Sequence, residues 1–311
     1  MNSIFKLYDR KFLDTFTTRR VGETKFGEVV GTIKELNDLK NTPAKYVLFG
    51  IPEDIGVRAN YGISGTSKAW SSCLPVLLNV QANHFTNPAK VIILGEVNCD
   101  EEMSKAAALN PEASDYFQQM GQLVKAIDVK VSTLVETLVA LGKIPVIVGG
   151  GHNNSYGNIK GSALALKQPV NAVNFDVHTD FRRLEHRHSG NGFSYAFEEG
   201  FLSKYFIFGL HHNYTSQDIF DQLDSNRQFL HYRLFEEIIT ESKITFEEAL
   251  NDAENFVDDK KFGLELDLDA VQHIPSSAMT PSGFSVNQAR NFVTYFSQNS
   301  NVCYLHLCEA S

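Results

Sequence analysis

Residues 144–153 read IPVIVGGGHN, an apolar run that ends in three glycines and a histidine. The run Ile144 to Gly149 has the length and composition of a buried strand. A similar arrangement recurs further along the chain, where NAVNFDVHTD at 171–180 and LELDLD at 264–269 place carboxylates after or within an apolar run. These three stretches therefore predict strands with polar side chains at their carboxyl ends.

Further apolar runs alternate with helical patterns over most of the chain. A helix is predicted at 117–141, with Gly142 as its cap. Several apolar runs are hydrophobic on both faces, which is typical of a parallel sheet covered by helices on both sides. The pattern predicts an α/β fold, with a single-domain, three-layer α/β/α architecture and a mostly parallel, doubly wound sheet. Strands are predicted at 45–51, 91–95, 144–149, 170–176, 204–210, 262–270 and 302–307.

Composition limits the class of protein. The 311 residues include 28 Lys and Arg against 37 Asp and Glu, a formal net charge of −9, which disfavours nucleic acid and anionic membranes as partners. No apolar run reaches the length of a membrane span, and the first residues lack the pattern of a signal peptide. The four cysteines form no C-x-x-C pair, so they are expected to be reduced in a cytoplasmic protein. Residues 1–44 are expected to be an N-terminal extension packed on a domain of residues 45–311.

Four aspartates and two histidines follow or end the three quoted strands. Residues two apart on an extended chain point to the same side, so Asp176 should converge with His178, and Asp267 with Asp269. Each motif alone is more often a solvated turn or a core residue, but unpaired carboxylates buried among leucines are costly. The whole set suits two divalent ions, manganese better than zinc, and such a pair activates water for hydrolysis. Its members are His152, Asp176, His178, Asp180, Asp267 and Asp269.

At these residues the sequence resembles the ureohydrolase family, which includes arginase, agmatinase and formimidoylglutamase. The resemblance rests on Gly149-Gly150-Gly151-His152, Asn174 to Asp180 and Asp267-Leu268-Asp269, with a further match at Phe49 to Val57. It implies an arginase-like fold, a trimer or hexamer, and two Mn²⁺ ions per chain held by the six residues above. Asp176 and Asp267 would bridge the ions. The resemblance also implies catalytic roles for Asp180, which would accept a hydrogen bond from the attacking hydroxide, and for Glu309, which would hold the amidine or guanidine group.

The loop FRRLEHRHSGNGF at 181–193 distinguishes members of this family. Arginases have Asn and a proton-shuttling His where this chain has Arg182 and Phe193, whereas formimidoylglutamases resemble it in Asp-x-Arg and Ser-Gly-x-x-Phe. Arg182 would then pair with a carboxylate of the substrate. Alternatively, Arg182, Arg183 and Arg187 belong to a surface loop that balances Glu185. The candidate substrate-binding residues are Arg182, Ser189, Asn191, His211 and Glu309.

These features predict a manganese-dependent amidine hydrolase with a small-molecule substrate. The expected reaction converts N-formimidoyl-L-glutamate and water to L-glutamate and formamide, a step of histidine breakdown. One alternative is another guanidino-acid or agmatine ureohydrolase. The other is a catalytically silent homologue that keeps the metals, which the complete set of six ligands disfavours.

Overall fold

The computed structural model describes residues 4–311. Its strands are β1 (Phe5–Leu7), β2 (Tyr46–Gly50), β3 (Val91–Val97), β4 (Ile144–Val148), β5 (Val170–Phe175), β6 (Leu202–Leu210), β7 (Leu230–Leu234), β8 (Phe262–Asp267) and β9 (Val302–Cys308). Its α-helices are α1 (Arg10–Asp14), α2 (Phe26–Val29), α3 (Ile55–Ala59), α4 (Ala69–Leu78), α5 (Asp100–Ala108), α6 (Tyr116–Ala140), α7 (Asn154–Leu166), α8 (Gly192–Glu198), α9 (Gln217–Ser225), α10 (Phe246–Val257) and α11 (Val286–Phe296).

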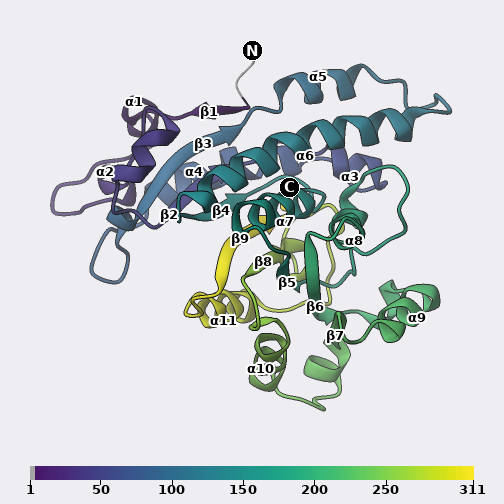
Figure 1. The fold of residues 1–311 in the computed structure, drawn as a ribbon. Coiled ribbons are helices and arrows are strands. Elements are labelled where there is room, and N and C mark those ends of the chain that lie inside the picture. The colour runs from purple at the N-terminus through teal and green to yellow at the C-terminus, as the bar shows by residue number, and fades with distance from the viewer. Residues whose placement is uncertain (1–3) are drawn as a thin grey trace.

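All of these strands belong to one twisted sheet at the centre of the molecule (Figure 1). Over the described residues the strand order is β1-β3-β2-β4-β9-β8-β5-β6-β7. Strands β3 to β7 in this order are parallel to their neighbours, and β1 pairs with β3 in the antiparallel sense. The prediction of an α/β fold with a mostly parallel sheet is therefore confirmed.

Alternate side chains of the strands pack against helices on the two faces of the sheet. In β6, Tyr205 and Ile207 belong to a core cluster that also contains apolar residues of α6 and α7. Phe206 and Phe208, which alternate with them along the strand, belong to a second cluster with residues of α10 and α11. Because successive residues of a strand point to opposite faces, one apolar run supplies both cores. This double burial explains why the run reads as hydrophobic throughout and produces the three layers.

The long helix α6 packs along α7 on one face of the sheet (Figure 1). Its predicted range of 117–141 agrees with the observed Tyr116–Ala140 within one residue at each end. A small residue on α7 permits the close approach: a Cβ added to Gly161 would lie 2.5 Å from the carbonyl oxygen of Ser132 on α6. The pair α6 and α7 covers the strands that lead into the site described below.

The structure differs from the predicted strands in two respects. The run 262–270 is a strand only as far as Asp267, and Leu268–Ala270 form a 3₁₀ turn. The edge strands β1 and β7 are additions that the sequence did not predict. Within the predicted extension, residues 1–3 lie outside the described residues, and β1 joins the sheet. Along residues 4–311, no helix combines the length and apolar character needed to cross a membrane.

Candidate metal and substrate site

The predicted ligands and Glu309 lie at the carboxyl ends of four adjacent strands. Strand β4 leads into the loop that carries His152, β5 is followed at once by Asp176, and β8 ends at Asp267. Glu309 follows β9, which lies between β4 and β8 in the sheet. Parallel neighbours bring their carboxyl ends to one edge of the sheet, which is where open α/β folds bind ligands.

Two short turns orient the second residue of each ligand pair. The Asp176 carboxylate accepts a hydrogen bond from the backbone N–H of His178 at 2.7 Å, and the Asp267 carboxylate accepts one from the N–H of Asp269 at 2.8 Å. Asp269 lies in the 3₁₀ turn and not on an extended strand. Because β5 ends at Phe175, His178 does not lie on an extended strand either. Strand alternation was therefore the wrong reason to expect His178 and Asp269 in the site, because an aspartate turn places each of them there.

The first set of ligands, here called the inner group, consists of His152, Asp176, Asp180 and Asp267. Its centre is the Nδ1 atom of His152, which lies 2.7 Å from an Asp180 oxygen, 3.0 Å from an Asp267 oxygen and 3.4 Å from an Asp176 oxygen. The side chains of His152 and Asp176 are fully buried, and that of Asp180 is 12% exposed. The inner group is thus almost closed to solvent.

The second set, here called the outer group, consists of Asp176, His178 and Asp269, so the two groups share Asp176. The Nδ1 atom of His178 lies 3.1 Å from an Asp269 oxygen and 3.6 Å from an Asp176 oxygen. The His178 side chain is 32% exposed, and its ring stacks on Tyr214 with the centroids 5.4 Å apart. The outer group is therefore the part of the ligand set that meets solvent.

The chemistry of these side chains fits divalent cations. Both ring nitrogens of His152, and one oxygen each of Asp269 and Glu309, are buried without a hydrogen-bond partner in the described structure. Burial and the charge of Asp269 raise the pKa of Asp267 well above its ordinary value, and burial raises the pKa of Asp269 to about 6. A cation at each group would offset the repulsion between carboxylates and give the unpartnered atoms a ligand. The residues present therefore suit two ions.

Asp180 and Glu309 are held in left-handed backbone conformations, with φ of 44° and 63°. Such conformations are costly for a residue with a side chain and persist where the surrounding contacts enforce them. For Glu309, the carboxylate accepts the His152 backbone N–H at 2.6 Å, while its own N–H donates to the Gly150 carbonyl at 3.1 Å. Burial, together with the charge of Asp267, raises the pKa of Glu309 to about 8. Glu309 is thus fixed to the loop that carries His152.

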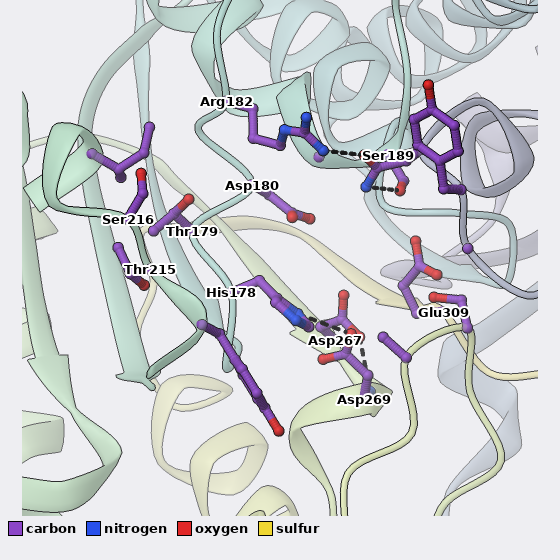
Figure 2. Close-up of a pocket in the computed structure, with 18 residues that line it drawn as sticks. His178, Thr179, Asp180, Arg182, Ser189, Thr215, Ser216, Asp267, Asp269 and Glu309 are labelled. Carbon is purple, nitrogen blue, oxygen red and sulfur yellow. Dashed lines mark hydrogen bonds and ion pairs between the residues drawn. The ribbon is translucent and has the colours of Figure 1, made fainter. Parts of the chain in front are cut away.

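A cavity of about 500 Å³ lies against both ligand groups. Figure 2 shows His178, Asp267 and Asp269 gathered on one side of it and Arg182 and Ser189 on the other. In the same view, Asp180 lies between the two sides, and Glu309 approaches from a separate segment (Figure 2). The cavity therefore has carboxylates and imidazole at one end and a guanidinium and a hydroxyl at the other.

Arg182 lies at the rim of this cavity with 51% of its side chain exposed. Its guanidinium donates to the Asn60 side-chain oxygen at 2.7 Å and lies 3.5 Å from a Glu185 oxygen. Ser189 also lines the cavity, and its hydroxyl accepts a hydrogen bond from the Asn60 amide at 3.1 Å. The positive group is therefore placed where a ligand could reach it, although solvent reaches it too.

Asn191 and His211 do not line the cavity. Asn191 is buried, and its amide donates to the His186 carbonyl at 2.9 Å within the 181–193 loop. His211 is buried behind Tyr214, with the two rings stacked 5.2 Å apart. Of the candidate substrate-binding residues, the structure brings Arg182, Ser189 and Glu309 to the cavity.

Arg187, for which the surface-loop alternative was considered, is only 1% exposed. Its guanidinium donates to both carboxylate oxygens of Asp128 on α6, at 3.0 and 3.2 Å. The surface alternative is thus wrong for Arg187, whereas Arg183 is 81% exposed and pairs with Asp218. The remaining Arg187 donors bind the carbonyls of Asn153 and His188 and the side chain of Asn191. Arg187 therefore ties α6 to the loop that follows His152 and to the 181–193 loop.

Glu53, which was not among the predicted site residues, supports the loop that carries His152. It is fully buried and accepts hydrogen bonds from the Gly151 N–H at 2.9 Å and the Asn154 amide at 2.7 Å. It also accepts the N–H of Ile55 at 2.7 Å, which fixes its own carboxylate. The acidic pair Glu53-Asp54 within the otherwise apolar stretch FGIPEDIGV was the signal that could have indicated a buried role.

Known proteins with similar sequences and folds include several formimidoylglutamases. Over 219 residues, 66% of this chain, the sequence is 28% identical to a formimidoylglutamase of Streptococcus gordonii, and the match spans 60% of the length of that relative. The formimidoylglutamase of Bacillus subtilis superposes with a TM-score of 0.73 at 17% identity, covering 95% of this chain and 86% of the other. The Trypanosoma cruzi formiminoglutamase with Mn2+2 gives 0.71 at 19% identity, covering 93% and 91%. At identities below 20%, the similarity to these two structures shows a shared fold and nothing more.

The family itself is set by the sequence match. A model of the arginase family matches residues 44–311, a range that contains all six predicted ligands and Glu309. Because that range covers most of the chain, this protein belongs to the arginase family.

Proposed function

We propose that this chain is a manganese-dependent hydrolase that cleaves a C–N bond of N-formimidoyl-L-glutamate, giving L-glutamate and formamide. The observation that carries the proposal is the arrangement of one cavity, with two ligand groups at one end and Arg182 and Ser189 at the other. The relatives named formimidoylglutamase support the choice of substrate. Residence in the cytoplasm and a trimeric or hexameric assembly stay predictions.

The inner group would hold one Mn²⁺ ion and the outer group a second, with Asp176 contributing to both. Bound divalent ions supply Lewis acidity and make water nucleophilic at neutral pH. The almost closed inner group keeps bulk water away from His152, while the more exposed His178 faces the cavity. The attacking water would therefore come from the cavity side.

The two ends of the cavity suit the two ends of the proposed substrate. The formimidoyl group carries a positive charge when protonated, and the unpartnered oxygen of Glu309 can accept its N–H. At the other end, the Arg182 guanidinium can donate two parallel hydrogen bonds to a carboxylate of the glutamate part, with the Ser189 hydroxyl beside it. Binding at both ends fixes the formimidoyl carbon in front of the ligand groups.

Asp180 is the carboxylate placed to handle the proton of the attacking water. It lines the cavity and lies against His152 Nδ1, so it touches both the ligand set and the space for substrate. In the proposed step, water would give one proton to Asp180 while its oxygen adds to the carbon of the protonated formimidoyl group. Asp180 would pass that proton to the glutamate nitrogen, the bond between this nitrogen and the formimidoyl carbon would break, and the remaining hydroxyl proton would go to the released amine, leaving formamide and L-glutamate. Phe193 packs edge-on against the His152 ring at 5.1 Å and carries no exchangeable proton, so it takes no part in this transfer.

The test is a metal analysis followed by a substrate panel. Protein saturated with Mn²⁺ should bind about two ions per chain and release formamide from N-formimidoyl-L-glutamate faster than it releases urea from arginine, agmatine or guanidinobutyrate. Chelated protein is the control and should be inactive until Mn²⁺ is returned. Faster turnover of agmatine or arginine would replace this proposal with another ureohydrolase activity, and ion binding without any turnover would indicate a silent homologue.

A further inference from the structure

A wholly buried polar cluster lies behind His152, and no member of it lines the substrate cavity. Glu265, Tyr304 and His306 each have no exposed surface. One Glu265 oxygen lies 2.6 Å from His306 Nδ1, and the other accepts the Tyr304 hydroxyl at 2.8 Å. The first of these oxygens also lies 3.6 Å from His152 Nε2, the ring nitrogen that points away from the inner group. The cluster thus lies beside the predicted ligand His152, on the side of its ring that faces away from the inner group.

The pairing of β8 with β9 builds this cluster. Glu265 and His306 are register partners on these neighbouring strands, and Tyr304 lies two residues before His306, on the same face. The Tyr304 ring occupies the space above Gly263, where an added Cβ would lie 2.0 Å from the ring. Glycine at this position is therefore what allows the tyrosine to reach the Glu265 carboxylate.

The cluster is also tied to the loop that carries His152. His306 Nε2 lies 3.2 Å from the Gly149 carbonyl oxygen, and a carbonyl can only accept, so Nε2 carries a proton. Gly149 is the first residue after β4, three positions before His152. Three adjacent strands, β4, β9 and β8, thereby fix the positions of the His152 loop and of Glu265 relative to each other.

The two ring nitrogens of His152 have different surroundings. Its Nδ1 atom faces the inner group, and its Nε2 atom is buried without a hydrogen-bond partner in the described structure. Cys308 belongs to the same buried set, but its thiol is directed to the Leu266 carbonyl at 3.7 Å. Glu265 therefore places a carboxylate oxygen 3.6 Å from Nε2. A carboxylate behind the second nitrogen of a metal-binding histidine fixes its tautomer and orientation and strengthens metal binding.

We propose that Glu265, held by His306 and Tyr304, is a positioning residue that orients His152 toward the inner ion and sets the affinity of that ion. The inference rests on the proposed two-metal site but goes beyond it, because Glu265 belongs to neither the inner nor the outer group and does not line the cavity. It predicts that the inner and outer ions respond differently to a change at one buried position that lies outside both ligand groups.

The experiment compares Mn²⁺ binding by the parent protein, Glu265→Gln and Asn171→Leu, using equilibrium dialysis with metal analysis. Asn171 is an equally buried polar residue of the same sheet whose amide bonds the Val257 carbonyl, so its loss controls for general damage to the core. Glu265→Gln should lower the affinity for one of the two ions by about tenfold to a hundredfold and leave the affinity for the other unchanged. Asn171→Leu should lower the melting temperature but leave both affinities unchanged.

Two further measurements keep the test decisive. Tyr304→Phe removes one hydrogen bond to Glu265 and should lower the affinity for the same ion by a smaller factor, about threefold. This variant tests the proposal even if Glu265→Gln fails to fold. With Co²⁺ in place of Mn²⁺, the visible spectrum of Glu265→Gln should shift, because it reports the geometry around the ion.

Each negative result has its own meaning. If the folded Glu265 and Tyr304 variants bind both ions as the parent does, the positioning role is overturned while the proposed function stands. If the parent binds no Mn²⁺, the proposed function fails and the positioning role fails with it.

Discussion

The inner and outer ligand groups have the same types of residue but very different surroundings. His152 is fully buried, with the Glu265 cluster behind it and Glu53 and Arg187 supporting its loop from two sides. His178 is 32% exposed, and the contact on its ring face is Tyr214, which itself borders the cavity. For the proposed two-ion site, the difference predicts a division of labour: the inner ion should be retained, and the outer ion should exchange with the cavity.

The largest effect is expected where the two groups meet. Asp176→Asn removes a carboxylate that belongs to both groups, so at least one Mn²⁺ ion and nearly all hydrolysis should be lost. Metal analysis and an activity assay check this, with Asp218→Asn as the control because that carboxylate is exposed and pairs with Arg183. Two tightly bound ions in active Asp176→Asn protein would show that the shared ligand is misassigned.

The buried Arg187–Asp128 pair, which supports the loops around the inner group, should contribute to the free energy of unfolding. Arg187→Leu leaves the buried Asp128 carboxylate without its partner, which should lower the free energy of unfolding by about 3–5 kcal/mol. Denaturant unfolding of the ion-free protein measures the change. Arg183→Leu, in the same loop but exposed, should leave the unfolding midpoint unchanged. Equal midpoints for the two variants would mean that the buried pair contributes no net stability.

A matched pair of substitutions compares the two groups directly. His152→Asn should remove the inner ion and His178→Asn the outer ion, so each variant should keep about one Mn²⁺. In the parent, dialysis against chelator should release the ions in two phases, the exposed outer ion first. Metal content followed over time measures this. Release of both ions at a single rate would contradict the division of labour.

Acidification should weaken ion binding. Burial and neighbouring carboxylates raise the pKa of Asp267 well above its ordinary value, and burial raises that of Asp269 to about 6. A raised carboxylate pKa means that protons occupy the ion-free site at higher pH, so ions must displace them and bind less well as pH falls. Calorimetry in buffers of different ionisation enthalpy should show proton release on Mn²⁺ binding. Heats that do not depend on the buffer would show that the ligands are already deprotonated.

The smallest effect is expected at the far end of the cavity. Arg182→Leu should raise KM for N-formimidoyl-L-glutamate by about threefold to tenfold, because a half-exposed guanidinium gains less from pairing than a buried one. Mn²⁺ binding should not change. Arg182→Lys keeps the charge but loses the paired donors, so its KM should lie between those of the parent and Arg182→Leu. An unchanged KM in Arg182→Leu would remove Arg182 from the substrate site.

The sequence predicted the central strands well because they are apolar on both faces, and it missed the two edge strands for the opposite reason. Strand β7, LHYRL, is mostly half-buried and carries His and Arg, so it has no continuous apolar run. The candidate ligands were predicted from three compact motifs. Their supports were not, because Arg187 binds Asp128 across 59 positions and Glu53 binds Gly151 across 98. One sequence carries no mark of which distant residues will pair.

The hydrogen bond between the His152 N–H and Glu309 spans 157 positions of the chain, and this separation bears on the order of events in folding. Contacts between residues so far apart form late, since the chain between them must first be ordered. The loop ends of β4, β5, β8 and β9 meet only after those strands have paired. In the proposed site, an ion would meet its complete set of ligands only in the fully paired sheet, and it would stabilise that state by mass action. Manganese would slow the unfolding of this protein and leave the rate of folding almost unaffected.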